Sequence, residues 1–287
     1  GMDVHKEMIV VTIRGKGIKT VTKSFKTFTS SLKKLREWLK KYEITHLAME
    51  STGVYWKPVF NVLGDDFTII LVNARHVRNV PGHKTDKKDS KWLAKLLLSG
   101  LLKGSFIPEK EIRDLRDLVR TKTQLTGEIS SAKNRFIKFM ESANIKLSTV
   151  LTNVFCVSGQ KIIAEILEGD YKPERLLYHV HGRVKAPRQD IIEALRGNLD
   201  DHYRFMMKTM LEHIANIEGV IVKIDEQIQQ KTEKHKELLD LLETIPGVGR
   251  DGAVCIIAEL GIDMEGFASH KHLASWAGMC PGNNESA

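Results

Sequence analysis

Residues 8–25, MIVVTIRGKGIKTVTKSF, contain two runs rich in β-branched side chains, at residues 8–13 and 20–25. Such runs favour extended backbone, because a branched Cβ packs well on a pleated sheet. Gly15 and Gly17 separate the runs, and glycines between two strands are typical of a tight connection. The stretch therefore predicts a β-hairpin near the beginning of the sequence.

The sequence that follows predicts a helix and two more strands. In residues 31–42 the apolar side chains recur at helical spacing, after a Thr/Ser cluster that can cap the helix. Residues 45–49 and 67–72 are short and almost continuously apolar, which is typical of buried strands. Strands that alternate with short helices predict an α/β fold for this part of the chain.

After Pro108 the pattern becomes that of long helices. Apolar residues recur at helical spacing from 109 to 144, and a second long helix is predicted from 201 to 243. The second helix has the heptad spacing of a coiled coil, so we expect the two helices to form an antiparallel or intermolecular coiled coil. Its apolar positions are Met210, Ile214, Ile217, Ile221, Ile224 and Ile228.

Composition excludes several classes of protein. Of 287 residues, 42% are hydrophobic and 28% charged, which is ordinary for a folded globular chain and excludes wholesale disorder. No apolar run approaches the roughly 20 residues of a membrane helix, and no signal-peptide pattern is present, so we expect a cytoplasmic protein. Three scattered cysteines without CxxC spacing argue against a disulfide framework or a structural zinc site.

Positive charge is concentrated in the first half of the chain. Residues 1–140 carry 28 Lys and Arg against 14 Asp and Glu, whereas residues 141–287 carry 16 against 22. An excess of this size attracts phosphate backbones through counterion release. A basic surface that only keeps the protein soluble explains the same numbers, so charge alone does not decide between them.

Four acidic residues in this half are candidates for a metal site. Asp3 and Glu50 lie in or at the end of predicted strands, and Asp86 and Asp89 share one face of a predicted helix. Converging carboxylates require a cation, and hard oxygen ligands select Mg²⁺ or Mn²⁺, which can clamp a phosphodiester. Four unrelated surface acids are the alternative, but nearby lysines favour a phosphate site. They are Lys84, Lys87, Lys88 and Lys91.

Two features near the end of the chain are weaker signals. Residues 241–260 predict a helix, a Pro-Gly-Val-Gly turn and a second helix, which can present backbone N–H groups to a phosphate. An ordinary turn between helices fits equally well. Ser286 lies in a Gly/Pro/Asn-rich loop, where a lone serine is usually a capping or solvated residue and no nearby histidine completes a triad.

Five segments spread over the chain carry a resemblance to a known family. They are GMDVHKE, MESTGVYWKPV, LVNARHVRNVPGHKTDKKDSKWLAKLLLSGLLKGSFIP, IPGVG and WAGMCPGNNESA. The sequence resembles the transposases of insertion-sequence family 110, the DEDD transposases, which are described as bridge-RNA-guided serine recombinases. The resemblance implies a RuvC-like domain of RNase H fold at 1–107, a helical and coiled-coil region at 108–240, and a C-terminal transposase domain at 241–287.

The resemblance also implies roles for individual residues. Asp3, Glu50, Asp86 and Asp89 would be the four acids that hold Mg²⁺ or Mn²⁺, and Ser286 would be the nucleophile. Serine attack on DNA would form a phosphoserine link, which conserves the phosphodiester bond energy for rejoining. The basic residues expected to contact nucleic acid are Arg75, His76, Arg78, Lys84, Lys87, Lys88 and Lys91.

The partners implied are donor and target DNA, a structured bridge RNA and further copies of the chain, in a bacterial or archaeal cytoplasm and associated with the nucleoid. We expect a homodimer or homotetramer held together by the heptad face, because Ser286 and the acids are far apart in sequence. Two other functions remain open: a RuvC-like nuclease or junction resolvase in which water attacks, and a non-catalytic nucleic-acid-binding scaffold. A covalent protein–DNA adduct separates the recombinase from the nuclease.

Overall fold

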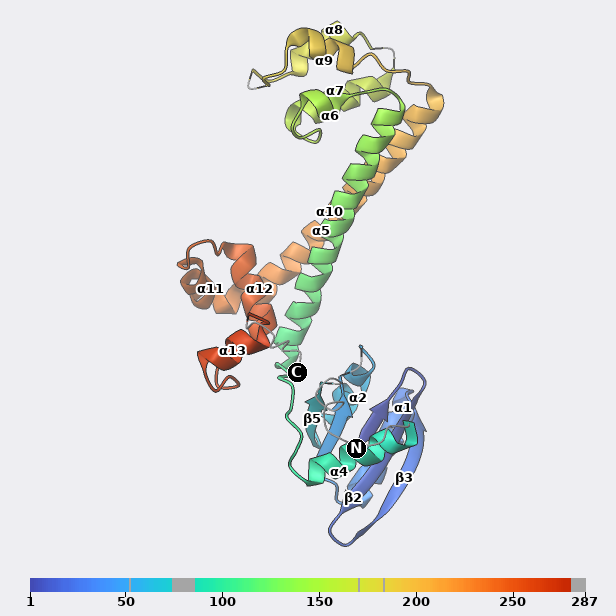
Figure 1. Cartoon of the computed structure of the whole chain (residues 1–287), viewed down its shortest axis with the longest axis vertical. Helices are drawn as coiled ribbons and strands as arrows, with labels where there is room; N and C mark the ends of the chain where they lie inside the picture. Colours follow the sequence, from blue (N-terminus) through green and yellow to red (C-terminus); the bar gives the residue numbers. More distant parts are fainter. Residues whose placement is uncertain (52, 74–85, 170, 183, 280–287) are drawn as a thin grey trace, which may run out of the picture. The chain divides into compact units, whose positions relative to one another are not determined.

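The computed structural model describes residues 1–51, 53–73, 86–169, 171–182 and 184–279, with residues 86–88 described by their backbone alone. The chain divides into two compact units, Gly1–Ile107 and Pro108–Ala287, and each is described by itself (Figure 1).

The first unit is built on a five-stranded sheet in the order β3-β2-β1-β4-β5. Strand β2 runs antiparallel to both β1 and β3, whereas β4 runs parallel to β1 and to β5. This mixed α/β arrangement is compatible with an RNase H-like fold. The strands are β1 (Met2–Val4), β2 (Met8–Gly15), β3 (Ile18–Lys26), β4 (His46–Glu50) and β5 (Thr68–Val72).

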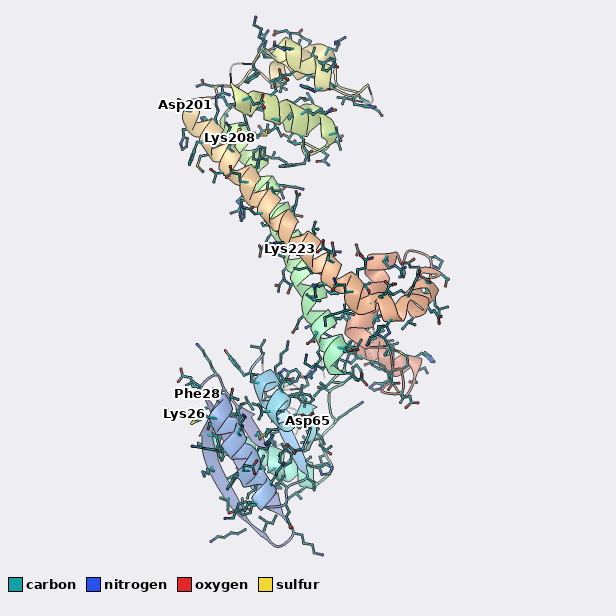
Figure 2. All side chains as sticks on the ribbon, turned by 180° about the vertical axis from the view of Figure 1, so that it is seen from behind. Lys26, Phe28, Asp65, Asp201, Lys208 and Lys223 are labelled. Carbon is teal, nitrogen blue, oxygen red and sulfur yellow. The ribbon has the colours of Figure 1, made fainter. Side chains whose placement is uncertain are left out.

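Helices cover both faces of this sheet. Helices α1 (Thr29–Lys41) and α2 (Trp56–Leu63) pack on one face, where they share a core with alternate residues of β1, β2 and β4. Helix α4 (Asp86–Leu98) packs against β1, β2 and β4, and the Oγ of its Ser90 lies 2.8 Å from Oγ1 of Thr12. Figure 1 shows α4 on the near side of the sheet, and Figure 2, from behind, shows α1 on the other.

The predicted strands and the first helix are confirmed. The hairpin forms with Ile9 opposite Phe25 and Ile13 opposite Val21, and the runs at 45–49 and 67–72 correspond to β4 and β5. The predicted Thr/Ser cap is wrong, because the N-cap residue of α1 is Phe28 and no side chain bonds there. Helix α1 begins at Thr29, so this threonine lies inside the first turn instead of preceding it.

The second unit is organised by two long helices, α5 (Lys110–Ser142) and α10 (Asp201–Thr232), which lie side by side (Figure 1). Phe136 near the end of α5 shares a core with Met207 near the start of α10, so the helices are antiparallel. The ion pair of Lys133 and Glu218, at 2.9 Å, crosses the middle of the pair. No helix in the described residues is both long enough and apolar enough to cross a membrane.

The expected use of the heptad face between subunits is wrong for its central residues. Ile214 and Ile217 are 4% and 7% exposed in the single chain, and both lie on α10, which packs along α5. A hydrophobic face that is already covered has little apolar area left to bury against another subunit.

The second helix is also shorter than the expected 201–243. Helix α10 ends at Thr232, whose buried hydroxyl donates to the carbonyl of Ile228, and a 3-10 turn at Glu233–His235 follows. Helix α11 (Lys236–Glu243) then starts separately. The other helices are α6 (Leu147–Val150), α7 (Val157–Glu168), α8 (Pro173–Leu176), the 3-10 helix η1 (Leu177–His179), α9 (Arg188–Ala194), α12 (Arg250–Leu260) and α13 (His270–Trp276).

Replacing Phe136 by Ala should destabilise the second unit by about 3–5 kcal/mol, because the ring is fully buried and its loss leaves a cavity. The matched control is Phe205→Ala on α10, where the ring is 66% exposed and the expected change is below about 0.5 kcal/mol. Urea unfolding followed by circular dichroism measures both. Equal losses in the two variants would contradict the described core.

Candidate functional site

Asp3 and Glu50 lie on neighbouring parallel strands at the same level of the sheet. Met2 of β1 is paired with Met49 of β4, so the next residues along both strands, Asp3 and Glu50, are also neighbours. Adjacent strands in a sheet are about 4.8 Å apart. The strand register therefore places two carboxylate-bearing residues side by side, with Glu50 at the carboxyl end of β4 and Asp3 in the middle of the three-residue β1.

Both acidic residues face the side of the sheet that α4 covers. Met2 and Met49 are fully buried in the core with α1 and α2, and successive side chains of a strand point to opposite faces. Asp3 is directly opposite Val10, which is on the same face as Thr12, the partner of Ser90 in α4. The side chain of Asp3 is 14% exposed, and its Oδ2 is hydrogen-bonded to Nε2 of the exposed His5 at 3.1 Å.

Helix α4 runs in the opposite direction to β1 and β4. Gly1 lies so close to Ser90 and Ala94 that a Cβ there would overlap their backbone atoms. The far end of α4, at Leu97 and Leu98, lines a cavity of about 400 Å³ with residues from the beginning of β4. The amino-terminal turn of α4 is thus directed toward the carboxyl end of β1, where Asp3 lies.

Asp86 and Asp89 occupy this first turn of α4. Asp89 is half-buried, and the side chain of Asp86 lies outside the described residues. Among side chains that the structure describes, no three acidic, His or Cys groups lie close enough together to hold a metal ion. The backbone directs the first turn of α4, which carries Asp86 and Asp89, toward Asp3 and Glu50. Carboxylate oxygens are the donors that fit a hard divalent cation.

The basic residues predicted to contact nucleic acid are only partly described. Lys91 is exposed on α4, and Lys95 one turn further places its Nζ 5.5 Å from the ring centroid of Trp92. Lys87 and Lys88 belong to the first turn of α4, where the backbone alone is described. The other four, Arg75, His76, Arg78 and Lys84, lie outside the described residues, as does Ser286.

The predicted Pro-Gly-Val-Gly turn between two helices forms, and it joins α11 to α12. The turn contains Gly247 with φ +88°, a conformation that glycine adopts without the strain of a Cβ, and Gly249 is the N-cap of α12. Arg250 at the start of α12 pairs with Asp240 and Glu243 of α11, each at 3.0 Å. These pairs brace the two helices against each other.

Three basic residues of α5 that the sequence did not single out hold α12 in place. Arg116 donates to the carbonyls of Ala258 and Glu259, and burial lowers its pKa below the usual value. Arg120 forms a two-pronged pair with the Glu259 carboxylate, at 2.8 Å for both bonds. Lys122 bridges Asp225 and Asp251, and these carboxylates raise its pKa although partial burial opposes them. Arg116 and Arg120 lie at the carboxyl end of α12, where positive side chains are stabilising.

Comparison with known proteins identifies the family. A model of DEDD transposases of the IS110 type, described as "Transposase", matches residues 1–145, which include the whole sheet and all four acids. This chain belongs to the IS110 family of DEDD transposases. A second model, "Transposase IS116/IS110/IS902 family", matches residues 239–287.

A transposase for insertion sequence element IS1533 from Leptospira borgpetersenii is 27% identical over 199 residues. The aligned region covers 67% of this chain and 57% of that relative. The second IS110-family match contains the turn between α11 and α12 together with Ser286, and residues 146–238 lie outside both family matches.

If the lysines between residues 84 and 91 of this IS110-family chain contact nucleic acid, neutralising them should weaken binding and lower the dependence of the affinity on salt concentration. The variant changes Lys84, Lys87, Lys88 and Lys91 to Gln. The slope of log affinity against log salt should fall by about 0.9 for each lost phosphate contact. Fluorescence anisotropy with a labelled 30-base-pair DNA duplex measures the slope.

The control changes four exposed lysines elsewhere in the first unit to Gln: Lys16, Lys19, Lys33 and Lys34. It makes the same change in net charge, so a similar loss in both variants would show that total charge alone determines binding. An unchanged slope in the first variant would mean that these four lysines do not contact phosphates.

Proposed function

We propose that this chain is a DNA transposase that cuts and rejoins DNA during movement of an insertion sequence. The observation that carries the proposal is the register of β1 and β4, which aligns Asp3 with Glu50 beside the first turn of α4. Ligands of open α/β sheets bind outside the carboxyl ends of the strands, and Glu50 ends β4 with Asp3 beside it on β1. The two IS110-family matches support the same function.

In this proposal Asp3, Glu50, Asp86 and Asp89 would hold Mg²⁺ or Mn²⁺. The cation, when bound, supplies stabilisation of the negative charge that develops on the scissile phosphate. The protein's own contribution is to hold carboxylates on two rigid strands and one helix, so that little reorganisation is needed before reaction. His5, paired with Asp3, would limit the orientations of that carboxylate.

Ser286 would be the nucleophile of strand cleavage. Its hydroxyl oxygen would attack phosphorus, lose its proton and displace one deoxyribose oxygen, so that a phosphoserine ester replaces the DNA phosphodiester. The displaced deoxyribose oxygen takes up a proton and becomes a hydroxyl, and a second DNA hydroxyl then attacks the phosphoserine ester in the reverse step, which rejoins the strands and returns the serine hydroxyl. Because the ester conserves the bond energy, no separate energy source is needed.

A structured bridge RNA would supply the choice of DNA sequence in this function. Base pairing can specify a target while the protein contacts only backbones, which agrees with an excess of basic residues in positions 1–140. The family resemblance supports this part of the proposal, and the RNA that copurifies with the protein is its direct test.

Replacing Ser286 by Ala should abolish cleavage and covalent capture of DNA, with binding nearly unchanged, because one hydroxyl contributes little affinity but is the attacking group. A denaturing gel of protein with labelled DNA and its RNA shows the adduct. Ser275→Ala, on the exposed side of α13, is the matched control and should retain the adduct. An adduct in the Ser286 variant rules out this nucleophile, and cleavage by the unaltered protein without any adduct favours the nuclease in which water attacks.

Replacing Glu50 by Gln should weaken Mn²⁺ binding by at least about tenfold and abolish cleavage, because a carboxylate ligand is lost while the side-chain shape is kept. Asp89→Asn should likewise weaken Mn²⁺ binding and abolish cleavage. Isothermal titration calorimetry with Mn²⁺ measures the affinity. Glu37→Gln on α1, whose side chain is 67% exposed, is the control and should leave it unchanged. Equal Mn²⁺ affinity in all variants would place the metal elsewhere.

A further inference from the structure

A surface groove lies at the end of the long helix pair, in the segment between α5 and α10. Its volume is about 1150 Å³, which is larger than a small-molecule pocket needs. The groove lies in the part of the chain that neither family match covers. Its lining residues come from three places: residues 149–153 at the end of α6 and just after it, the start of α7, and η1 with residues 180, 181 and 184–186.

The lining of this groove carries two lysines, and one carboxylate just outside it, that of Glu165, is hydrogen-bonded to a lining histidine. Lys161 and Lys185 are exposed at its edge, and His179 and His181 contribute two imidazoles. Among the described lining residues there is no Asp or Glu. Glu165, on the next turn of α7, is bonded to Nε2 of His179 at 2.6 Å. The groove therefore favours an anionic ligand.

Tyr178 gives the groove an aromatic surface that is almost entirely exposed to solvent. Its side chain belongs to η1 and is 91% exposed, although burying an aromatic ring is normally favourable. Among the described residues the ring has one aromatic neighbour, the imidazole of His179, which meets it edge-on with 5.8 Å between the ring centroids. The flat face of the ring is consequently accessible for stacking.

The base of the groove is held by the core of the second unit. Leu151 belongs to that core, and Val180 and Val184 pack against it. The backbone N–H of His181 donates to Oγ of the buried Ser158 at 3.1 Å, which ties the segment after η1 to α7. The ligand surface is thus formed before any ligand binds.

We propose that this groove binds a single-stranded segment of nucleic acid, with phosphates at Lys161 and Lys185 and one base stacked on Tyr178. Stacking requires a base that is free of its own neighbours, so a single strand fits and a duplex does not. Hydroxyls and an amide at Thr149, Thr152 and Asn153 line the same groove and can bond to sugar and base edges. The proposal goes beyond the proposed strand-transfer chemistry, because it does not depend on Ser286 or on the acids.

The test uses the full chain and photo-cross-linking oligonucleotides of ten nucleotides. One contains 4-thiouridine in RNA and the other 4-thiothymidine in DNA, and mass spectrometry of digested protein locates the adducts. Peptides that contain Tyr178 should be labelled by one or both strands, and the preferred strand identifies the ligand as RNA or DNA. Mapping is needed because the basic first unit is expected to bind the same probes.

Two variants test the named contacts. Tyr178→Ala should weaken binding at this groove roughly fivefold to 100-fold, the range for loss of one stacked base, whereas Tyr178→Phe should retain it. Lys161→Gln with Lys185→Gln should lower the cross-link yield and reduce the salt slope by about 0.7 per lost contact. The matched control is Lys208→Gln with Lys223→Gln, two exposed lysines on α10 outside the groove (Figure 2).

Several results would overturn the proposal. They are the absence of any adduct near Tyr178, equal competition by duplex and single strand for that adduct, and equal loss of yield in the two double-lysine variants. Circular dichroism establishes that each variant is folded. Repeating the mapping in the Ser286→Ala protein separates this site from the strand-transfer chemistry, since the adduct should persist there.

Discussion

The alternation of side chains along the three-residue strand β1 is the constraint on which the first unit depends. Met2 and Val4 lie in the core with α1 and α2, and Asp3 between them faces α4. A shift of one residue in register would exchange these faces and place a carboxylate in an apolar core, which is costly. The pairing with β4 and the packing of α4 both follow from this register, so the same apolar contacts that stabilise the sheet also position the candidate site.

The second unit depends on a different contact, the antiparallel packing of α5 on α10. That packing buries the central heptad residues within one chain and leaves α12 to be held against α5 by Arg116 and Arg120. The two parts of the proposed chemistry thus belong to different compact units, the acids to the first and Ser286 to the second. Cleavage requires that they meet, either within one chain or between copies, and an interface between copies would have to use a surface other than the central heptad face.

Charge summed over long segments and charge at a local surface give different information. Residues 141–287 are acidic in total, yet the groove beside Tyr178 has cations and no acidic lining residue among those described. Most acidic side chains of this half are on exposed helix faces or in ion pairs, such as Glu218 with Lys133 and Glu259 with Arg120. Charges more than about 8 Å from a ligand are largely screened at physiological salt, so the local arrangement of charges decides binding.

The sequence by itself determined the elements whose signals are local. The β-branched runs with Gly15 and Gly17 predicted the hairpin, helical periodicity predicted α1 and α5, and the family resemblance was confirmed. Tertiary structure alone decided which helix covers the heptad face, where α10 ends, and which exposed residues gather around Tyr178. An apolar stripe specifies that something must cover it but not which partner does, and residues distant in sequence become neighbours only when packing brings their helices together.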